Sequence, residues 1–141
     1  AFAGILSDGR VVTWGRPDFG GDSDDVADQL RNVQQIQATK GAFAAILADG
    51  SAVAWGHAMY GGDSTEVQEL LRNVQQIQSN AHAFAAILGD GTVVTWGDPD
   101  HGGNSSKVQD QLRNVRQVQA TKFAFAALLA DGSVVTWGDP R

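Results

Sequence analysis

The sequence predicts a mainly β protein in which one unit of 41 residues is repeated head to tail. The tryptophans Trp14, Trp55, Trp96 and Trp137 follow one another at this interval, and an Asp-Gly pair precedes each of them within an apolar phrase. A fixed period of about 20 to 50 residues is typical of solenoids and propellers, in which one unit cannot bury its apolar face alone. We therefore expect a single repeat domain over residues 1–141, with a hairpin at 1–15 and repeats at about 16–56, 57–97 and 98–138.

Each unit is predicted to contain a β-hairpin, because Asp-Gly supplies the positive φ angles of a tight turn between two apolar runs. The hairpins are expected at about residues 1–14, 42–55, 83–96 and 124–137. The strand before each turn, such as AFAAIL, is apolar on both faces, which predicts a sheet stacked between two neighbouring sheets. The residues expected to anchor the repeat are Trp14, Trp55, Trp96, Trp137, Phe43, Phe84, Phe125, Asp49, Gly50, Asp90 and Gly91.

The segment between hairpins is predicted to form a short helix or helical turn and then a further strand. Asp63 with Glu66 three residues later has the pattern of a helix cap, and Val67, Leu71 and Val74 share one helical face. Helical turns are expected at about 23–31, 64–72 and 105–113, followed by a strand of the type NVQQIQAT. The arginines that recur at the ends of these segments are expected to cap the helices or to pair with aspartates. They are Arg31, Arg72 and Arg113.

Composition excludes several classes of function. The net charge is −6 with only 10 Lys and Arg residues, which argues against a nucleic-acid partner. No apolar run approaches the roughly 20 residues that span a bilayer, and the absence of cysteine excludes disulfides and thiolate metal sites. The chain opens inside a repeat at Ala1, without an initiator Met or a cleavable signal, which indicates a processed product or a piece of a longer protein. We expect it to be soluble and intracellular, in the cytosol or in an organelle after processing.

The repeat resembles that of the regulator-of-chromosome-condensation family, whose unit is a β-propeller blade, in a short variant of 41 residues. The matching residues of the second unit are Ile36, Ala38, Ala45, Ile46, Asp49, Gly50, Val53, Trp55, Gly56, Gly61, Val67 and Leu71. The chain departs from the family at Thr39-Lys40 and Ala42, where the family has a glycine pair and a histidine. The resemblance implies propeller-like blades, here in an incomplete propeller or an open arc, because a typical ring has about seven blades. Members of the family bind proteins as scaffolds, as exchange factors for small GTPases, or as substrate-recruiting parts of ubiquitin ligases.

The polar groups recur almost unchanged from unit to unit, whereas a catalytic site needs a few unique groups in unlike environments. We therefore expect no enzyme activity, no cofactor and no metal site. The aspartates of the Asp-Gly pairs are explained by their turns. His57, His82 and His101 occupy three different positions of the repeat, so they are interpreted as solvent-exposed substitutions rather than as ligands.

Residues that differ between copies are the candidates for binding a partner, because variable rim positions carry the specificity of repeat proteins. They lie after the Trp-Gly pair, before the glycine pair and before the Ala-Phe strand. These candidates are Arg16, Phe19, His57, Tyr60, His82, Asp98, His101 and Phe123.

The expected function is that of a non-catalytic protein-interaction or scaffold module, an accessory subunit or a fragment within a larger complex. The alternatives are a propeller that regulates or exchanges nucleotide on a small GTPase, or the substrate-recruiting part of a ubiquitin ligase. A carbohydrate- or metal-binding propeller is a third alternative, for which the sequence offers no ligand cluster. The two ends are expected to expose apolar faces through which the chain can self-associate. These faces carry Phe2, Ile5 and Val11 at one end and Leu128, Val134 and Trp137 at the other.

Overall fold

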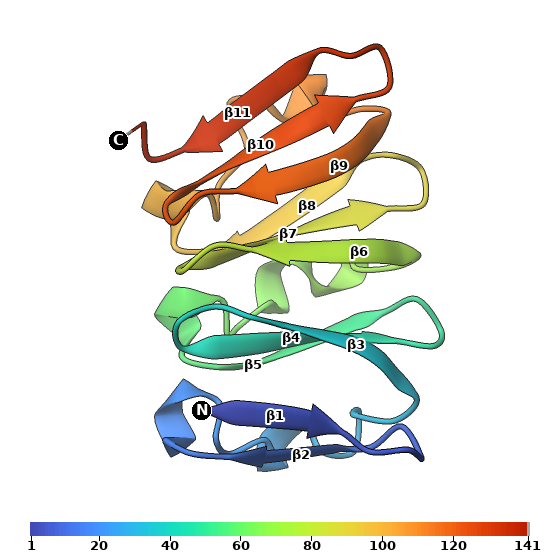
Figure 1. Ribbon diagram of the computed structural model, residues 1–141, viewed down its shortest axis with the longest axis vertical. Coiled ribbons are helices and arrows are strands. Elements are labelled where there is room, and N and C mark those ends of the chain that lie inside the picture. The colour runs from blue at the N-terminus through green and yellow to red at the C-terminus, as the bar shows by residue number, and fades with distance from the viewer. Residues whose placement is uncertain (141) are drawn as a thin grey trace.

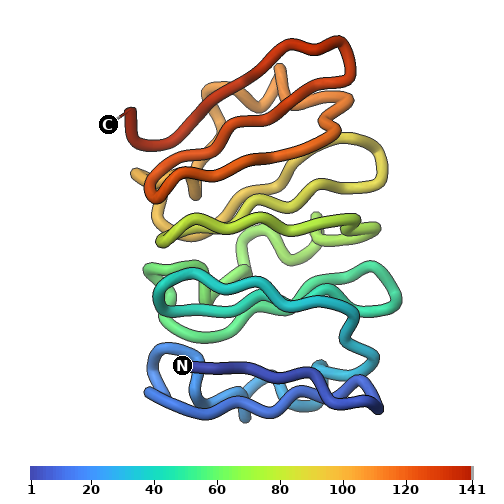
Figure 2. The backbone as a smooth tube through the Cα atoms, viewed as in Figure 1, coloured from blue at the N-terminus to red at the C-terminus, as the bar shows by residue number. Residues whose placement is uncertain are grey.

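The protein consists of four antiparallel sheets, which we call blades 1 to 4, stacked along one axis (Figure 1). This computed structural model describes residues 1–140. Blade 1 has two strands and each of the others has three, with the strand that begins the hairpin in the middle. Blade 1 contains β1 (Phe2–Ile5) and β2 (Val11–Trp14), and blade 2 contains β3 (Val33–Ala38), β4 (Ala42–Leu47) and β5 (Ala52–Gly56). Blade 3 contains β6 (Val74–Ser79), β7 (Ala83–Leu88) and β8 (Val93–Gly97). Blade 4 contains β9 (Val115–Ala120), β10 (Ala124–Leu129) and β11 (Val134–Gly138). The two ends of the chain lie at opposite ends of the stack, so the blades form an open arrangement (Figure 2).

The four predicted hairpins are confirmed. In blade 3, Phe84 lies opposite Trp96, and the same pairing joins Phe43 to Trp55. Of each Asp-Gly pair, which was expected to supply the positive φ angles of the turn, only the glycine has one. Gly50 adopts a φ of 85°, and the carboxylate of Asp49 instead accepts a hydrogen bond from the backbone N–H of Ser51 at 2.9 Å. Together with the Ser51 hydroxyl, this bond holds the pKa of Asp49 below its usual value.

Within residues 1–140, the helices of the connecting segments are all short 3₁₀ helices. Those within 23–31, 64–72 and 105–113, where longer helical turns were expected, are η2 (Asp24–Val26), η4 (Thr65–Leu70) and η6 (Gln109–Gln111). The helix after blade 2 ends because Leu71, which is 1% exposed, leaves the helical conformation to enter the core. The cap also differs from the prediction. Asp63 accepts a hydrogen bond from the N–H of Thr65, two residues on, which is an Asx turn rather than a capping box.

The arginines at the ends of these segments make none of the expected ion pairs. Within residues 1–140, the arginine–aspartate pairs join Arg10 to Asp8 and Arg16 to Asp18, each at 2.8 Å. Both pairs are exposed and join residues two positions apart, so they fix local turns. Arg31, Arg72 and Arg113 project from exposed positions of the chain instead.

Each blade is joined to the preceding one by the same lock. The indole N–H of Trp96 donates to the carbonyl of Gly61 at 3.0 Å, and the ring of Phe84 packs on that glycine. A Cβ at Gly61 would lie 2.6 Å from this ring, which explains why the position is glycine. Trp55 and Trp137 make the equivalent bonds to Gly20 and Gly102, both at 3.1 Å. The tryptophan of each blade therefore ties it to the segment that leaves the blade before.

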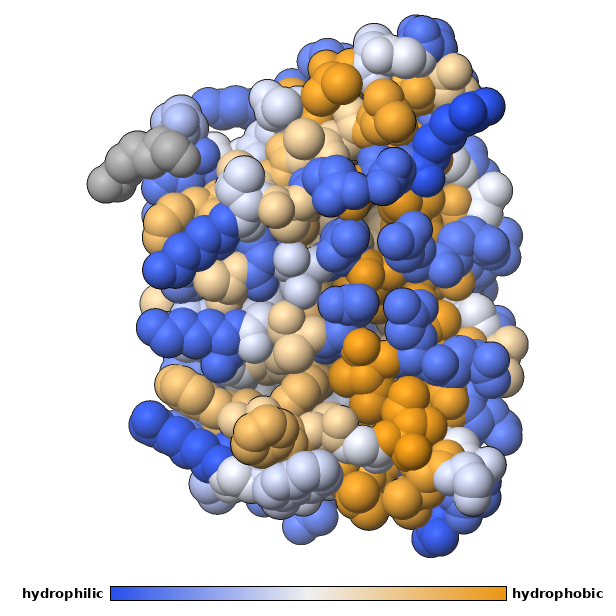
Figure 3. All heavy atoms as spheres, viewed as in Figure 1, coloured by the Kyte–Doolittle hydropathy of each residue, from blue (hydrophilic) through white to orange (hydrophobic). Residues whose placement is uncertain are grey.

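The core is divided into clusters between successive blades. Phe84 and Trp96 of blade 3 pack with Ala42, Ala44 and Ile46 of blade 2. Apolar surface remains at the ends of the stack (Figure 3), where Phe2 is 65%, Trp14 53% and Val134 59% exposed. Trp137 was expected on the exposed C-terminal face and is only 8% exposed, because it packs inward against blade 3. Within residues 1–140 there is no helix long and apolar enough to cross a membrane.

Candidate protein-binding rim

Three short helices place the variable residues along one edge of the stack. They are η1 (Pro17–Phe19), η3 (Ala58–Tyr60) and η5 (Pro99–His101), and each follows the last strand of a blade. Each helix ends at a glycine with left-handed backbone, at a φ between 96° and 103°, which turns the chain back toward the next blade. Each begins directly after the candidate residue that follows Trp-Gly. These are Arg16, His57 and Asp98.

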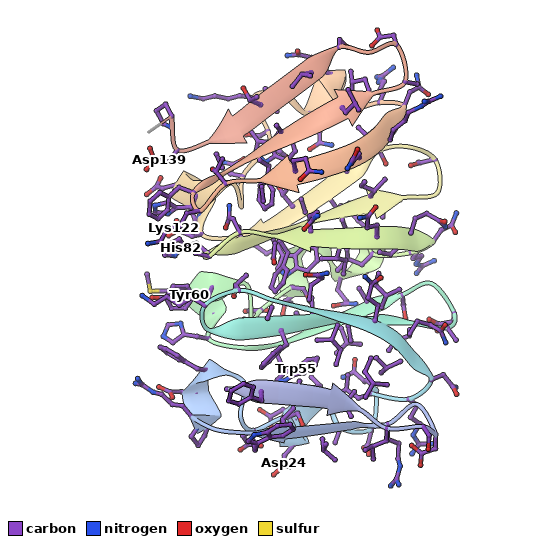
Figure 4. All side chains as sticks on the ribbon, viewed as in Figure 1. Asp24, Trp55, Tyr60, His82, Lys122 and Asp139 are labelled. Carbon is purple, nitrogen blue, oxygen red and sulfur yellow. The ribbon has the colours of Figure 1, made fainter. Side chains whose placement is uncertain are left out.

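The residues that precede the hairpins reach the same edge. Ala83 lies opposite Gly97 in the hairpin of blade 3, so His82 lies beside the segment that follows Gly97. Figure 4 shows Tyr60, His82, Lys122 and Asp139 following one another along this edge. We define the rim row as the eight candidates that the structure brings together here. They are Arg16, Phe19, His57, Tyr60, His82, Asp98, His101 and Phe123.

The N-terminal half of the rim row is a cluster of rings packed edge to face. The guanidinium of Arg16 lies 4.3 Å from the centre of the Phe19 ring, in the geometry of a cation–π contact. The Phe19 ring meets the rings of His57 and Tyr60 at centroid distances of 5.5 and 5.8 Å. His57 and Tyr60 are themselves 5.3 Å apart. Aromatic rings from the segments after blades 1 and 2 thus form one surface.

In the C-terminal half of the row the rings are stacked. His82 lies between Tyr60 at 5.4 Å and Phe123 at 5.5 Å, stacked on both, and the ring of His101 lies 4.5 Å from it. The three histidines are partly buried by these contacts, so the prediction that they are solvent-exposed substitutions is wrong. Burial, and then the proximity of His101, lower the pKa of His82 from its usual value of 6.5.

Two carboxylates flank His101. Its Nδ1 lies 2.8 Å from Oδ2 of Asp98, and its Nε2 lies 3.8 Å from Oδ2 of Asp139. The other oxygen of Asp98 accepts a hydrogen bond from the backbone N–H of Asp100 at 2.9 Å, which orients this carboxylate. The Asp98 carboxylate is therefore held in place by the turn that carries it.

Sequence reasoning named the eight residues of the rim row but missed their contacts and two charged neighbours. Lys122, whose ammonium lies 5.4 Å from the centre of the Phe123 ring, and Asp139, which lies beside His101, flank the row. The missed contact joins the residue before a hairpin to the residue before the following glycine pair. In blade 2 these residues are Gly41 and Tyr60, and a Cβ at Gly41 would lie 2.6 Å from the Tyr60 ring. Their equivalents one unit later are His82 and His101.

An open groove of about 1070 Å³ lies between the connecting segments that leave blades 2 and 3, and none of the eight residues of the rim row lines it. Val67, Leu70 and Leu88 are among its apolar residues. Trp96 also lines the groove, but its indole N–H bonds to Gly61 and so has a structural role. The groove therefore brings together fewer of the variable residues than the rim does.

These stacked blades, each with an Asp-Gly hairpin and each of blades 2 to 4 tied to its predecessor by a tryptophan, have the RCC1-type β-propeller repeat fold. No protein-family model and no curated protein matches the sequence. Among solved structures, the chain is similar to Prp20p of Saccharomyces cerevisiae, with a TM-score of 0.67 and 16% identity over 96% of this chain and 42% of that one. Human WBSCR16 matches with a TM-score of 0.60 and 20% identity over 96% of this chain and 44% of that one. The computationally designed Ika4 protein matches with a TM-score of 0.54 and 18% identity over 97% of this chain and 84% of that one. The chain thus spans less than half the length of the two natural proteins.

Proposed function

We propose that this chain is a non-catalytic protein-interaction module that binds its partner through the rim row. The observation that carries the proposal is the gathering of the variable residues on one edge, while the repeated residues make the core and the locks. Tyr, Phe and Arg are enriched at the centres of protein interfaces, because they supply large contact areas together with a polar group. In the rim row, Phe19 contacts both Arg16 and Tyr60.

The fold supports a binding role within a larger assembly. The similar protein Prp20 has been solved bound to Kap60, and its binding to Gsp1p and histones has been described. We propose that residues 1–141 act as one domain, because hydrogen bonds and core clusters join each blade to the next. In this proposal the domain is an accessory or scaffold part of a complex whose other members contact the rim.

Charge reversal at the two ends of the rim row tests the proposal. Arg16→Glu and Lys122→Glu change exposed side chains that contact Phe19 and Phe123, so the fold should be preserved. Lys107→Glu and Arg113→Glu, on the connecting segment before blade 4, are matched controls because they reverse the same charge at exposed positions. Affinity capture with quantitative mass spectrometry should show one partner that is lost with the rim variants and retained with the controls. Equal capture by all four variants would place the binding surface elsewhere.

A second candidate function is nucleotide exchange on a small GTPase, which the likeness to the Gsp1p-binding protein Prp20 favours. It predicts that the chain accelerates the release of a fluorescent guanine nucleotide from a GTPase at substoichiometric amounts. The proposed scaffold role predicts no acceleration, even for a GTPase that binds the rim row. The release assay therefore separates the two roles.

A further inference from the structure

The densest set of metal-ligand groups in residues 1–140 lies in the C-terminal half of the rim row. His82, Asp98 and His101 each offer one ligand atom, and the three atoms lie within 4.8 Å of one another. Ligands of a tetrahedral zinc ion lie about 2.0–2.1 Å from the metal and hence about 3.3 Å apart. Side-chain rotations that move the ligand atoms by about 1–2 Å therefore suffice to close the site around an ion.

We propose that His82, Asp98 and His101 bind one divalent transition-metal ion of the zinc type. Nδ1 of His101 and Oδ2 of Asp98 are 2.8 Å apart and now share a hydrogen bond. In the metal-bound form the ion takes the place of that proton. The ring of His82, 4.5 Å from that of His101, supplies the third ligand. Water occupies the fourth position.

The surroundings orient these ligands as the second shell of a metal site does. Asp98 is fixed by the bond from the N–H of Asp100 to its other oxygen, which leaves Oδ2 for the metal. A ligating histidine usually donates its second ring N–H to a carboxylate, which fixes the tautomer. Asp139 lies on that side of His101, with Oδ2 3.8 Å from Nε2, so it need approach by only about 1 Å to accept the Nε2–H bond when Nδ1 holds the ion.

The ligand set also selects the class of metal. Two imidazoles with one carboxylate suit Zn²⁺, Co²⁺, Ni²⁺ and Cu²⁺, whereas Mg²⁺ and Ca²⁺ prefer oxygen ligands alone. The rings of Tyr60 and Phe123 stack on either side of His82 and limit access of water to it. All three proposed ligands flank the hairpin of blade 3, because His82 precedes β7 whereas Asp98 and His101 follow β8. A bound ion would therefore fasten the two ends of that hairpin at the rim.

The site also shows why sequence reasoning expected no metal here. That expectation assumed that a repeat protein would build a metal site from equivalent positions. His82 and His101 occupy different positions of one repeat, and they meet because the hairpin places the residue before its first strand beside the turn after its second. A site of this kind occurs once in the stack, at the repeat in which both positions are histidine.

Isothermal titration of ZnCl₂ into the full chain, made without a histidine tag and freed of metal with EDTA, tests the proposal. We expect one ion per chain and an upward shift in melting temperature that grows with the zinc concentration. His82→Gln, His101→Gln and Asp98→Asn should each abolish this binding or weaken it by more than about tenfold. Asp139→Asn should weaken it by about 10–100-fold, the range found for second-shell partners.

His57→Gln is the matched control, because His57 belongs to the rim row but not to the three-residue cluster. Its zinc affinity should equal that of the wild type, and the absorption of bound Co²⁺ should report a tetrahedral site in both. Absence of saturable binding would overturn the proposal. So would zinc binding that persists unchanged in a His82→Gln, His101→Gln double variant, since the ion would then lie on other groups. Neither result depends on whether the rim binds a protein.

Discussion

Blades 1 and 3 contain nearly the same hairpin in different surroundings. AFAGILSDGRVVTWG and AFAAILGDGTVVTWG both pair the phenylalanine with the tryptophan, with ring centres 5.7 and 5.2 Å apart. Yet Phe2 and Trp14 are 65% and 53% exposed, whereas Phe84 and Trp96 are 0% and 5% exposed. Local sequence therefore specifies the hairpin, and the neighbouring blade decides whether the aromatic pair becomes core.

The largest expected effect is the difference in unfolding free energy between a Trp96→Ala and a Trp14→Ala variant. Trp96→Ala should lower the free energy of unfolding by about 3–5 kcal/mol, because it removes a buried indole and leaves a cavity between blades 2 and 3. Trp14→Ala should lower it by less than about 1 kcal/mol, because half of that side chain is already exposed to water. Urea denaturation of both variants measures the difference. Equal losses would mean that burial in the stack does not set the role of the tryptophan.

A second pair of substitutions compares a glycine inside the stack with one at its end. Gly61→Ala should destabilise by about 2–4 kcal/mol, because the new methyl group meets the Phe84 ring at 2.6 Å and the backbone φ is 96°. Gly132→Ala carries similar strain at a φ of 88° but has no atom within 4 Å, so about 1 kcal/mol is expected. Thermal melts of the two variants test the contrast. A loss at Gly132 as large as that at Gly61 would show that backbone strain alone sets the effect.

The exposed aromatic pair of blade 1 should also promote association. Phe2 and Trp14 stack on one another at the end of the stack, and soluble monomers rarely expose a large continuous apolar patch. We expect light scattering after size-exclusion chromatography to give a mass above the 14.9 kDa of one chain. A Phe2→Ser, Trp14→Ser variant should move toward that monomer mass. A wild-type chain that remains monomeric at all concentrations would contradict this expectation.

The smallest expected effect concerns the hairpin turns, in which the aspartate accepts from a Ser or Thr hydroxyl in each of blades 2 to 4. Hydrogen bonds from Thr92 lower the pKa of Asp90 below its ordinary value of 3.8, so the ionised form is favoured in the folded state. A lowered pKa stabilises the fold above about pH 3.8, and this contribution is lost as the pH falls through the folded-state value. Asp90→Asn should therefore be slightly less stable than the wild type at pH 6. The difference should shrink in melts below pH 3.8, and a difference that grows there would contradict the assignment.

Sequence reasoning succeeded where one residue type determines the backbone. Asp49-Gly50 and its equivalents placed the hairpins, and the unlike residues at equivalent positions identified the rim row. It failed where tertiary contacts determine the backbone conformation or the burial of a side chain. The pattern of Val67, Leu71 and Val74 reads as a helical face, but burial of Leu71 ends the 3₁₀ helix at Leu70. The direction in which each tryptophan packs, which buries Trp137 and exposes Trp14, depends on contacts between blades that spacing alone does not reveal.

Each blade packs on the blade that precedes it in the sequence, so the order of packing matches the order of synthesis. Trp55, Trp96 and Trp137 each donate the indole N–H to a carbonyl 35 residues earlier in the chain, and each core cluster joins a blade to its predecessor. A blade emerging from the ribosome therefore finds its docking surface already complete and needs nothing that has yet to be translated. This packing order lets each blade dock as it is made, and the most recently made blade presents the surface on which the next one docks.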